Sequence, residues 1–193
     1  MTLSPLKKLA IVFGTTIFLQ GCVAAVIGGG AVAAKVATDP RTTGSQIDDE
    51  TLEFKVENAV EKDAQIKAEG RVNAVSYNGR VLLIGQVPND NVKETATDLT
   101  RGVEGVNDTY NQLTIGPKIS FAQISKDSWI TTQVKSKMFV DGRVKATDVK
   151  VISENGEVFL LGNVTQSQAN AAADIASKIS GVKKVIKVFK YLD

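Results

Sequence analysis

The sequence contains one cysteine and no histidine, so it lacks the commonest general base and the commonest metal ligand of proteins and has a single thiol. Cys22 is the single thiol. It follows Gly21 at the end of an N-terminal stretch that is first basic, at Lys7 and Lys8, and then apolar. A basic segment, a short apolar segment and a small residue are typical of an export signal that a peptidase removes. The pattern therefore predicts that the mature chain begins at Cys22.

Leu19-Gln20-Gly21-Cys22 resembles the lipobox of bacterial lipoproteins. The resemblance implies that residues 1–21 are cleaved as a signal peptide and that Cys22 is the lipidation site, acylated on its sulfur and its new amino group. Val23, rather than Asp, implies sorting to the outer membrane. Two alternatives are an ordinary secretory signal with an incidental cysteine and a transmembrane helix. The glycines at 28–30 interrupt the apolar run before the roughly 20 residues that a span requires, which favours an anchor.

The missing histidine also argues against an enzyme, because it removes the commonest general base and every Ser-His or Cys-His pair. No glycine-rich phosphate loop opens a predicted helix. The paired carboxylates Asp48 and Asp49 stand where an acidic helix start is expected, which explains them without catalysis. We therefore predict no enzymatic activity, no catalytic residues, no cofactor, no metal and no small-molecule substrate.

The mature chain contains an internal repeat. Residues 77–87 (Tyr-Asn-Gly-Arg-Val-Leu-Leu-Ile-Gly-Gln-Val) return as residues 154–164 (Glu-Asn-Gly-Glu-Val-Phe-Leu-Leu-Gly-Asn-Val), with Asn-Gly, the apolar run and the second glycine in register. Three matched blocks in the same order indicate a duplication. The other two pairs of blocks are 56–60 with 134–138, and 105–106 with 181–182.

The periodicity of each copy predicts the element order αββαβ. Leu52, Val56 and Val60 recur every fourth residue, as in an amphipathic helix, and Asn78-Gly79 is a strong signal for a two-residue hairpin turn. The first copy predicts helices over 49–62 and 88–101 and strands over 72–77, 80–86 and 106–114. The second copy predicts helices over 127–139 and 165–180 and strands over 147–153, 157–163 and 182–191.

These elements define an α+β fold with two tandem domains, each a three-stranded mixed sheet with two helices on one face. The predicted divisions are a signal peptide over 1–21, a lipidated cysteine with a flexible tether over 22–47, a first domain over 48–115, a linker over 116–125 and a second domain over 126–193. Small domains of this size have modest cores, so docking between them is expected.

The repeats are similar to the BON family, through an N-G-x-V-x-L-x-G-x-V centre and a late G-V-x-x-V. Residues 155–164 and 181–185 carry both motifs, whereas the first copy departs from the late motif at Asn107. The resemblance implies tandem BON-type domains, binding of anionic phospholipid, a role in outer-membrane integrity and enrichment at the division site. It also implies a lipid-anchored protein on the periplasmic face of the outer membrane.

The two copies carry opposite net charge. Residues 48–115 contain seven Lys and Arg against thirteen Asp and Glu, a net charge of −6, whereas residues 118–193 contain twelve against seven, a net charge of +5. A basic module gains roughly 1 kcal/mol for each Lys or Arg near an anionic bilayer. The second copy is therefore the predicted membrane-binding module. Alternatively, the opposite net charges attract the two copies to each other across a domain interface.

One helix of the second copy has the pattern of an interfacial helix. Ile130, Val134 and Met138 form the stripe expected to face the sheet, and Trp129 and Phe139 project nearly opposite. At the matched positions the first copy has Thr51 in place of Trp129 and Glu61 in place of Phe139. It has Glu57 in place of Lys135. Lys126 flanks the same face, and the predicted lipid-binding residues are Trp129, Thr132, Lys135, Ser136, Lys137 and Phe139.

Three alternatives remain open at this point. The only tryptophan of a small protein is commonly packed, so Trp129 and Phe139 belong to the core in the first alternative. In the second, the acidic copy and the exposed sheet edges bind an envelope assembly or peptidoglycan-remodelling protein, which makes the chain an adaptor. A nucleic-acid partner is disfavoured, because export removes the ligand and the lysines alternate with acids.

Overall fold

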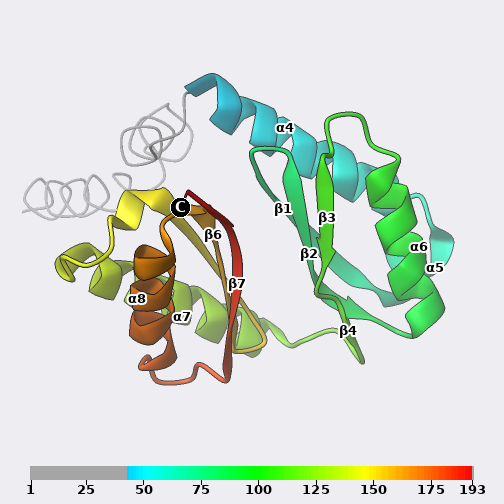
Figure 1. Ribbon diagram of the computed structural model, residues 1–193. Coiled ribbons are helices and arrows are strands. Elements are labelled where there is room, and N and C mark those ends of the chain that lie inside the picture. The colour runs from blue at the N-terminus through cyan, green and yellow to red at the C-terminus, as the bar shows by residue number, and fades with distance from the viewer. Residues whose placement is uncertain (1–42, 193) are drawn as a thin grey trace, which may run out of the picture. The chain divides into compact units, whose positions relative to one another are not determined.

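The computed structural model describes residues 43–192, so the lipobox and most of the predicted tether lie outside the described residues. The first domain consists of α4 (Thr43–Val60), α5 (Ala64–Glu69), β1 (Arg71–Tyr77), β2 (Arg80–Val87), α6 (Asp90–Arg101), β3 (Asp108–Asn111) and β4 (Thr114–Ile115). The second consists of α7 (Phe121–Val140), the 3-10 turn η1 (Ala146–Asp148), β5 (Val149–Glu154), β6 (Glu157–Val164), α8 (Gln166–Ser177) and β7 (Lys184–Tyr191). Figure 1 shows this order along the chain.

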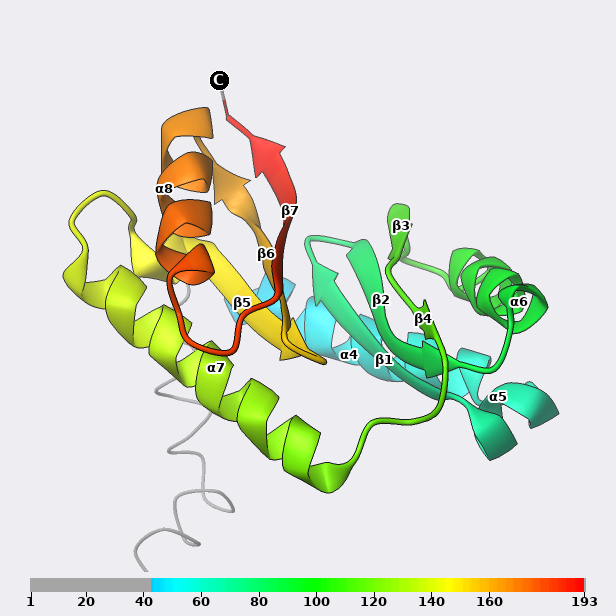
Figure 2. The ribbon, with the colours of Figure 1, turned by 90° about the horizontal axis from the view of Figure 1, so that it is seen from below.

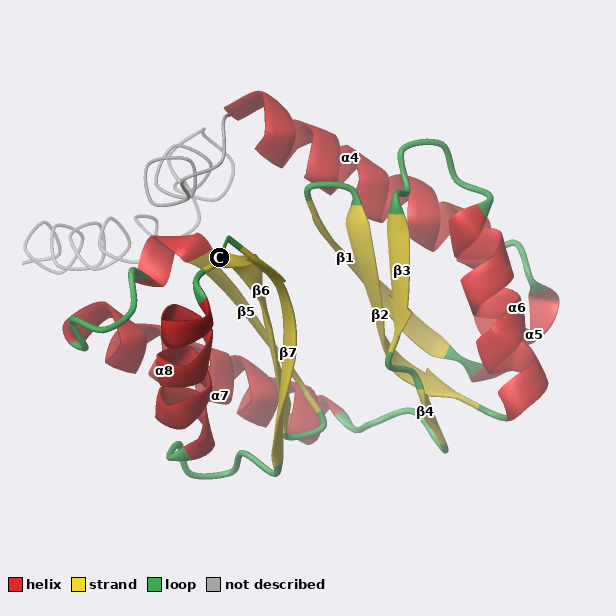
Figure 3. Cartoon of the chain, in the orientation of Figure 1, coloured by secondary structure: helices red, strands yellow, loops and turns green. Residues whose placement is uncertain are grey.

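Both domains have the predicted mixed sheet. β1 and β2 pair antiparallel, and β3 and β4 both pair parallel to β2 along its other edge. In the second domain β5 and β6 pair antiparallel and β6 and β7 pair parallel. Helices α4 and α6 cover one face of the first sheet, and α7 and α8 cover one face of the second (Figure 3). The predicted α+β fold with two αββαβ domains is confirmed.

Several element bounds differ from the predictions. α4 begins at Thr43, inside the segment predicted as tether, and α7 begins at Phe121, inside the predicted linker, because Ser120 Oγ caps it by accepting from Gln123 N–H at 3.2 Å. The third strand of the first domain is interrupted between β3 and β4, since Leu113 turns into the core and is 1% exposed. The short helix α5 and the turn η1 were not predicted.

A buried aspartate holds the hairpin turn in each domain. Both central residues of each Asn-Gly turn have positive φ, 52° and 74° in the first domain and 51° and 80° in the second, as a tight hairpin requires. Asp127 of α7 accepts from the backbone N–H groups of Asn155 and Gly156 at 2.7 and 2.8 Å. Asp49 of α4 accepts from Asn78 and Gly79 N–H in the same way, at 2.8 and 3.1 Å. These contacts fix each first helix over its own hairpin.

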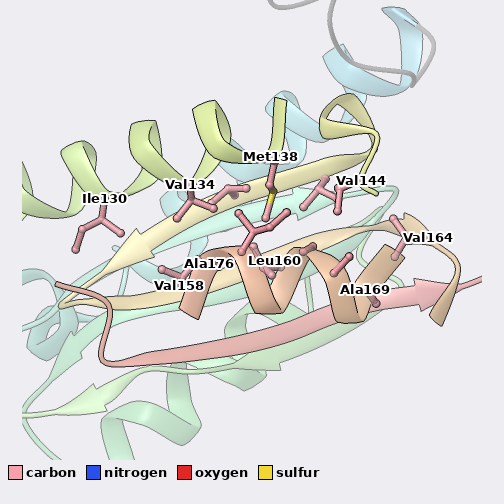
Figure 4. Packing of buried hydrophobic residues seen from close by; sticks show 14 residues of the cluster. Ile130, Val134, Met138, Val144, Val158, Leu160, Val164, Ala169 and Ala176 are labelled. Carbon is pink, nitrogen blue, oxygen red and sulfur yellow. The ribbon is translucent and has the colours of Figure 1, made fainter. Parts of the chain in front are cut away.

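The inward stripe of α7 is the one that the sequence predicts. Ile130, Val134 and Met138 are each at most 1% exposed, and they pack onto the sheet beside the small side chains of α8, including Ala169 and Ala176 (Figure 4). Alanines at these positions let α8 approach closely while favouring helix. Because the inward stripe is fixed by this packing, the opposite side of α7 faces outward.

The helix-free faces of the two sheets meet in an apolar cluster of their own. Tyr77 and Leu82 of the first sheet and Phe159 of the second are at most 3% exposed. Val75, Ile84, Leu161 and Val188 complete the buried part of this cluster. The layers therefore run helix, sheet, sheet, helix, which can be followed in Figure 2. Docking between the domains was expected, and the structure shows that they dock through the helix-free faces of their sheets.

Polar pairs surround this contact and join the two domains. Arg71 Nη1 lies 2.6 Å from Glu154 Oε1, which also accepts from Gln86 Nε2 at 2.6 Å. Lys150 Nζ donates to Glu53 Oε1 at 2.7 Å. Of these two ion pairs, only Lys150–Glu53 joins a base of the second copy to an acid of the first, and Arg71–Glu154 has the reverse sense. The residues predicted to bind lipid take no part in either pair.

Replacing Asp127 with alanine is expected to lower the free energy of unfolding by about 2 to 4 kcal/mol, because two backbone N–H groups in the hairpin lose their acceptor. Urea denaturation followed by the fluorescence of Trp129, the only tryptophan, measures this change. Asp98→Ala is the control, since that carboxylate is 70% exposed and its removal is expected to change stability by less than about 0.5 kcal/mol. Equal effects of the two substitutions would contradict the role of Asp127.

Glu57 is expected to destabilise the first domain when charged. Burial raises its pKa, the Ala74 N–H that it accepts opposes this, and nearby Glu53 and Glu61 raise the pKa further. A raised pKa means that the fold penalises the carboxylate, so stability is lost as the pH rises through the folded-state pKa. Glu57→Gln keeps the oxygen that accepts from Ala74 and should raise the Tm at pH 7.

The Tm difference between Glu57→Gln and wild type should shrink as the pH is lowered and the carboxylate protonates. Thermal melts across that pH range, with Glu94→Gln on the exposed side of α6 as control, measure it. A Tm difference that does not depend on pH would exclude the charge as the cause.

Candidate membrane-binding face

The outward side of α7 presents large apolar side chains to solvent. Trp129 is 52% exposed and Phe139 is 79% exposed. The alternative in which these rings belong to the core or to the contact between domains is therefore wrong. Thr132 and Ser136, also exposed, lie between the rings on the same side of the helix. The structure thus brings together the aromatic and hydroxyl residues that the sequence predicts.

Two further residues of this face were missed. Phe121 is 82% exposed and Val140 is 77% exposed, at the two ends of α7. The sequence contained the signal for Phe121, because it stands eight residues before Trp129 and so projects to a similar side of a continuous helix. The prediction stopped short because it began the helix at Asp127. With both ends included, the outward face extends along about 30 Å of helix.

The hydroxyls of this face do not all require water. Thr132 Oγ1 donates to Ser128 O at 3.0 Å, and Ser128 Oγ donates to Ile124 O at 3.0 Å. A hydroxyl that already has a backbone acceptor loses less on leaving water than one without. These side chains therefore fit a face that enters a less polar environment.

Lysines flank the face on both sides. Lys126, Lys135 and Lys137 are all exposed, and Lys137 stands in the last turn of α7. Beyond that turn Asp141 pairs with Arg143 at 2.8 Å, and this pair lowers the pKa of Asp141 to about 2. The carboxylate nearest the end of the face is thus charged at neutral pH and already matched by a cation.

The exposed charge of the second domain is more one-sided than its net charge indicates. Among the described residues of the second domain, the exposed charged side chains are all Lys or Arg. Its partly exposed carboxylates each lie within 4.0 Å of a base in the same domain: Asp141 of Arg143, Asp148 of Lys145, Glu157 of Lys184, and Asp174 of Lys178. The exposed carboxylates belong to the first domain: Asp48, Glu50, Glu61, Glu69, Asp90, Glu94, Asp98, Glu104 and Asp108.

The corresponding side of α4 differs in charge and in the placement of apolar residues. Thr51 and Glu61 are exposed at the positions that match Trp129 and Phe139, as the sequence predicts. Ile47 and Phe54 are also exposed, at 57% and 68%, which the sequence comparison did not single out. This side of α4 is therefore apolar in part, yet acidic.

Two other kinds of site, a metal centre and a membrane-spanning helix, have no candidate among the described residues. Within residues 43–192 no group of three or more potential ligands is placed to hold a metal ion. No helix in that part of the chain meets the length and hydropathy that crossing a bilayer takes. The outward face of α7 is thus the candidate site, and its geometry is that of an interfacial helix on an αββαβ scaffold.

Comparison with known proteins agrees with this class of scaffold. Residues 48–117 and 126–193 each match the BON domain model, so the chain belongs to the BON domain family. It is 92% identical over 193 residues to the outer membrane lipoprotein DolP of Haemophilus influenzae, with both chains covered completely. The chain is an outer-membrane, lipid-anchored protein of this family. The family and the names of its relatives favour a non-enzymatic role.

Two more distant relatives match most of the chain. The 21 kDa hemolysin of Actinobacillus pleuropneumoniae is 54% identical over 154 residues, covering 80% of this chain and 79% of that protein. The osmotically-inducible protein Y of Escherichia coli is 30% identical over 154 residues, covering 78% of this chain and 76% of that protein.

Iodide should quench the fluorescence of Trp129 more strongly than caesium does, by about two-fold or more, because the exposed indole lies in a field of lysines. Stern–Volmer plots at low ionic strength measure the two quenching constants, and added salt should bring them together. Replacing Lys126 and Lys137 with Gln should reduce the preference for iodide. Equal quenching by both ions in the wild-type chain would show that the face is not electropositive.

Proposed function

We infer that the outward face of α7 binds anionic phospholipid while acyl chains at Cys22 hold the protein on the periplasmic face of the outer membrane. The observation that carries this proposal is the exposure of Trp129 and Phe139 in a domain whose exposed charged side chains, over residues 118–192, are all basic. The domain divisions proposed with it are a signal over 1–21, a lipidated tether up to α4, and two BON domains. Support of outer-membrane integrity, with enrichment at the division site, is the proposed role.

The apolar part of the binding comes from the rings. Trp129 and Phe139, with Phe121 and Val140 at the ends, form an outward row that is parallel to the helix axis. Such a row allows the helix to lie along the bilayer surface, with its rings at the boundary between headgroups and acyl chains. Lysine stems cover apolar surface while their ammonium groups reach phosphates.

The electrostatic part comes from the separation of surface charge. Each Lys or Arg near an anionic surface contributes roughly 1 kcal/mol, so Lys126, Lys135 and Lys137 together favour contact by about 3 kcal/mol before any dehydration is counted. The acidic helix layer of the first domain is repelled by the same surface. Attraction on one side and repulsion on the other orient the protein with α7 towards lipid.

The lipid anchor makes a weak contact sufficient. Acyl chains at Cys22 hold the α7 face at high effective concentration beside the bilayer, so lipid binding becomes an intramolecular step. A face that is weak by itself is then able to respond to lipid composition. No catalytic group, cofactor, metal or small-molecule substrate enters this function, and the proposed partner is an anionic phospholipid membrane.

A second candidate function is an adaptor for an envelope assembly or peptidoglycan-remodelling protein. The observation in its favour is the acidic helix α4, with Ile47 and Phe54 exposed on the side that an anionic surface repels. This function is compatible with the first, because lipid binding uses α7. Retention of the chain on membranes only in the presence of a protein partner would favour the adaptor.

Glutamate at Trp129 or Phe139 should weaken binding to anionic vesicles about ten-fold or more, since each substitution removes an apolar contact and adds repulsion. The chain is prepared from position 22 onwards with Cys22→Ser, so that no acyl chain contributes. Co-sedimentation with phosphatidylglycerol-containing and purely phosphatidylcholine vesicles measures the binding.

Phe54→Glu is the matched control, because it makes the same change at an exposed ring of the corresponding helix in the first domain. Binding of this control should equal that of the parent chain, and the thermal melts of all variants should stay close together. If Phe139→Glu folds normally and sediments with anionic vesicles as the parent does, the α7 face is not the lipid site.

A further inference from the structure

Lipid binding leaves the outward side of α4 without a role. Ile47 and Phe54 stand seven residues apart on that side and are 57% and 68% exposed. The exposed charged residues of the same helix are Asp48, Glu50 and Lys55, and the exposed Glu61 follows directly after its last residue, so the surroundings are acidic on balance. Exposed apolar side chains with a polar rim are typical of interaction surfaces. An anionic bilayer repels this surface, so its occupant must be something else.

The chemistry of the surface specifies an occupant that is basic and carries exposed rings. The chain itself presents such a surface, namely the outward face of α7. We propose that the outward side of α4 binds the α7 face of a second copy of this chain. The proposal rests on the proposed lipid function, because both use the α7 face. It extends that function by naming the occupant of the α7 face when no lipid is bound.

Side-chain size is complementary between the two helices. Asp49 and Asp127 make the same hairpin contacts, so positions along α4 and α7 correspond. Thr51 of α4 stands where α7 has Trp129, and Phe54 stands where α7 has Thr132. Each helix therefore offers a small residue at the position where the other carries a ring, which suits interdigitation. The charges are complementary too, with Asp48 on α4 and Glu61 directly after its end against Lys126 and Lys137 on α7.

The contact joins two different surfaces, so it is head to tail. A pair formed in this way keeps one unused α7 face, on the first copy, and one unused α4 side, on the second, and the assembly does not close by a two-fold axis. Because the α7 face serves both partners, lipid and a neighbouring copy compete for it. The neighbour covers Trp129 and Phe139 when no anionic lipid is available, and lipid releases the neighbour.

Sedimentation velocity of the Cys22→Ser chain, prepared from position 22, tests this contact. At low ionic strength the weight-average mass should rise with concentration, with a Kd of about 100 μM or tighter, and about 0.5 M salt should return the chain to a monomer. Phe54→Asp and Phe139→Glu should each weaken self-association about ten-fold or more. Ile115→Asp, at an exposed apolar residue away from α4, should associate as the parent does.

Mixing the two variants gives the decisive result. The Phe54→Asp chain retains a sound α7 face and the Phe139→Glu chain retains a sound α4 side, so together they should form a one-to-one dimer with the affinity of the parent contact and no larger species. A mixture that stays monomeric, a parent chain that stays monomeric at low salt, or a Phe54→Asp chain that associates as the parent does would each overturn the proposal.

Vesicle co-sedimentation measures the lipid binding separately from self-association. Phe54→Asp should bind anionic vesicles as the parent does, and anionic vesicles should dissociate the parent's self-association. The proposal expects every α4 variant to lose self-association and to keep its binding to anionic vesicles. Vesicle binding by the parent without any self-association overturns this inference and leaves the lipid function standing.

Discussion

The structure depends on the contact between the two sheets. Each αββαβ domain has one sheet face covered by its own helices and one face left bare, and neither domain is large enough to expose a bare apolar face to water. Burying Tyr77, Leu82 and Phe159 against one another satisfies both domains at once. This contact also sends both helix layers outward, away from each other, which leaves the outward sides of α4 and α7 exposed to solvent.

Duplication preserved the scaffold and changed the surface. The aspartate that holds each Asn-Gly turn, the inward stripe of the first helix and the parallel third strand recur in both domains, because each of them supports packing. The outward side chains are under no such constraint. They have become basic and aromatic on α7 and acidic on α4, so one fold carries two surfaces of opposite character.

Opposite surfaces on one anchored molecule have a mechanical consequence. In the proposed function, an anionic bilayer attracts the α7 layer and repels the α4 layer, which orients the protein as well as attaching it. The proposed α7 contact needs only modest affinity, because the lipid anchor supplies the retention on the membrane. The same arrangement gives a reason for the segregated charge: neutral, evenly mixed domains would be held by the anchor but would not be oriented by it.

The sequence by itself determined the αββαβ order of both copies, the duplication and the central part of the outward face of α7, because these depend on local periodicity, turn residues and helical geometry. Helical spacing alone separates Ile130 and Val134 from Trp129. The sequence did not determine whether Trp129 is exposed or packed on the other domain, nor where α4 and α7 begin. Only the tertiary structure decided these points, since exposure depends on which bare faces meet, and the ends of a helix depend on caps such as Ser120 and on what the first turn contacts. The pairing of β3 and β4 with β2 was decided in the same way, by the turn of Leu113 into the core.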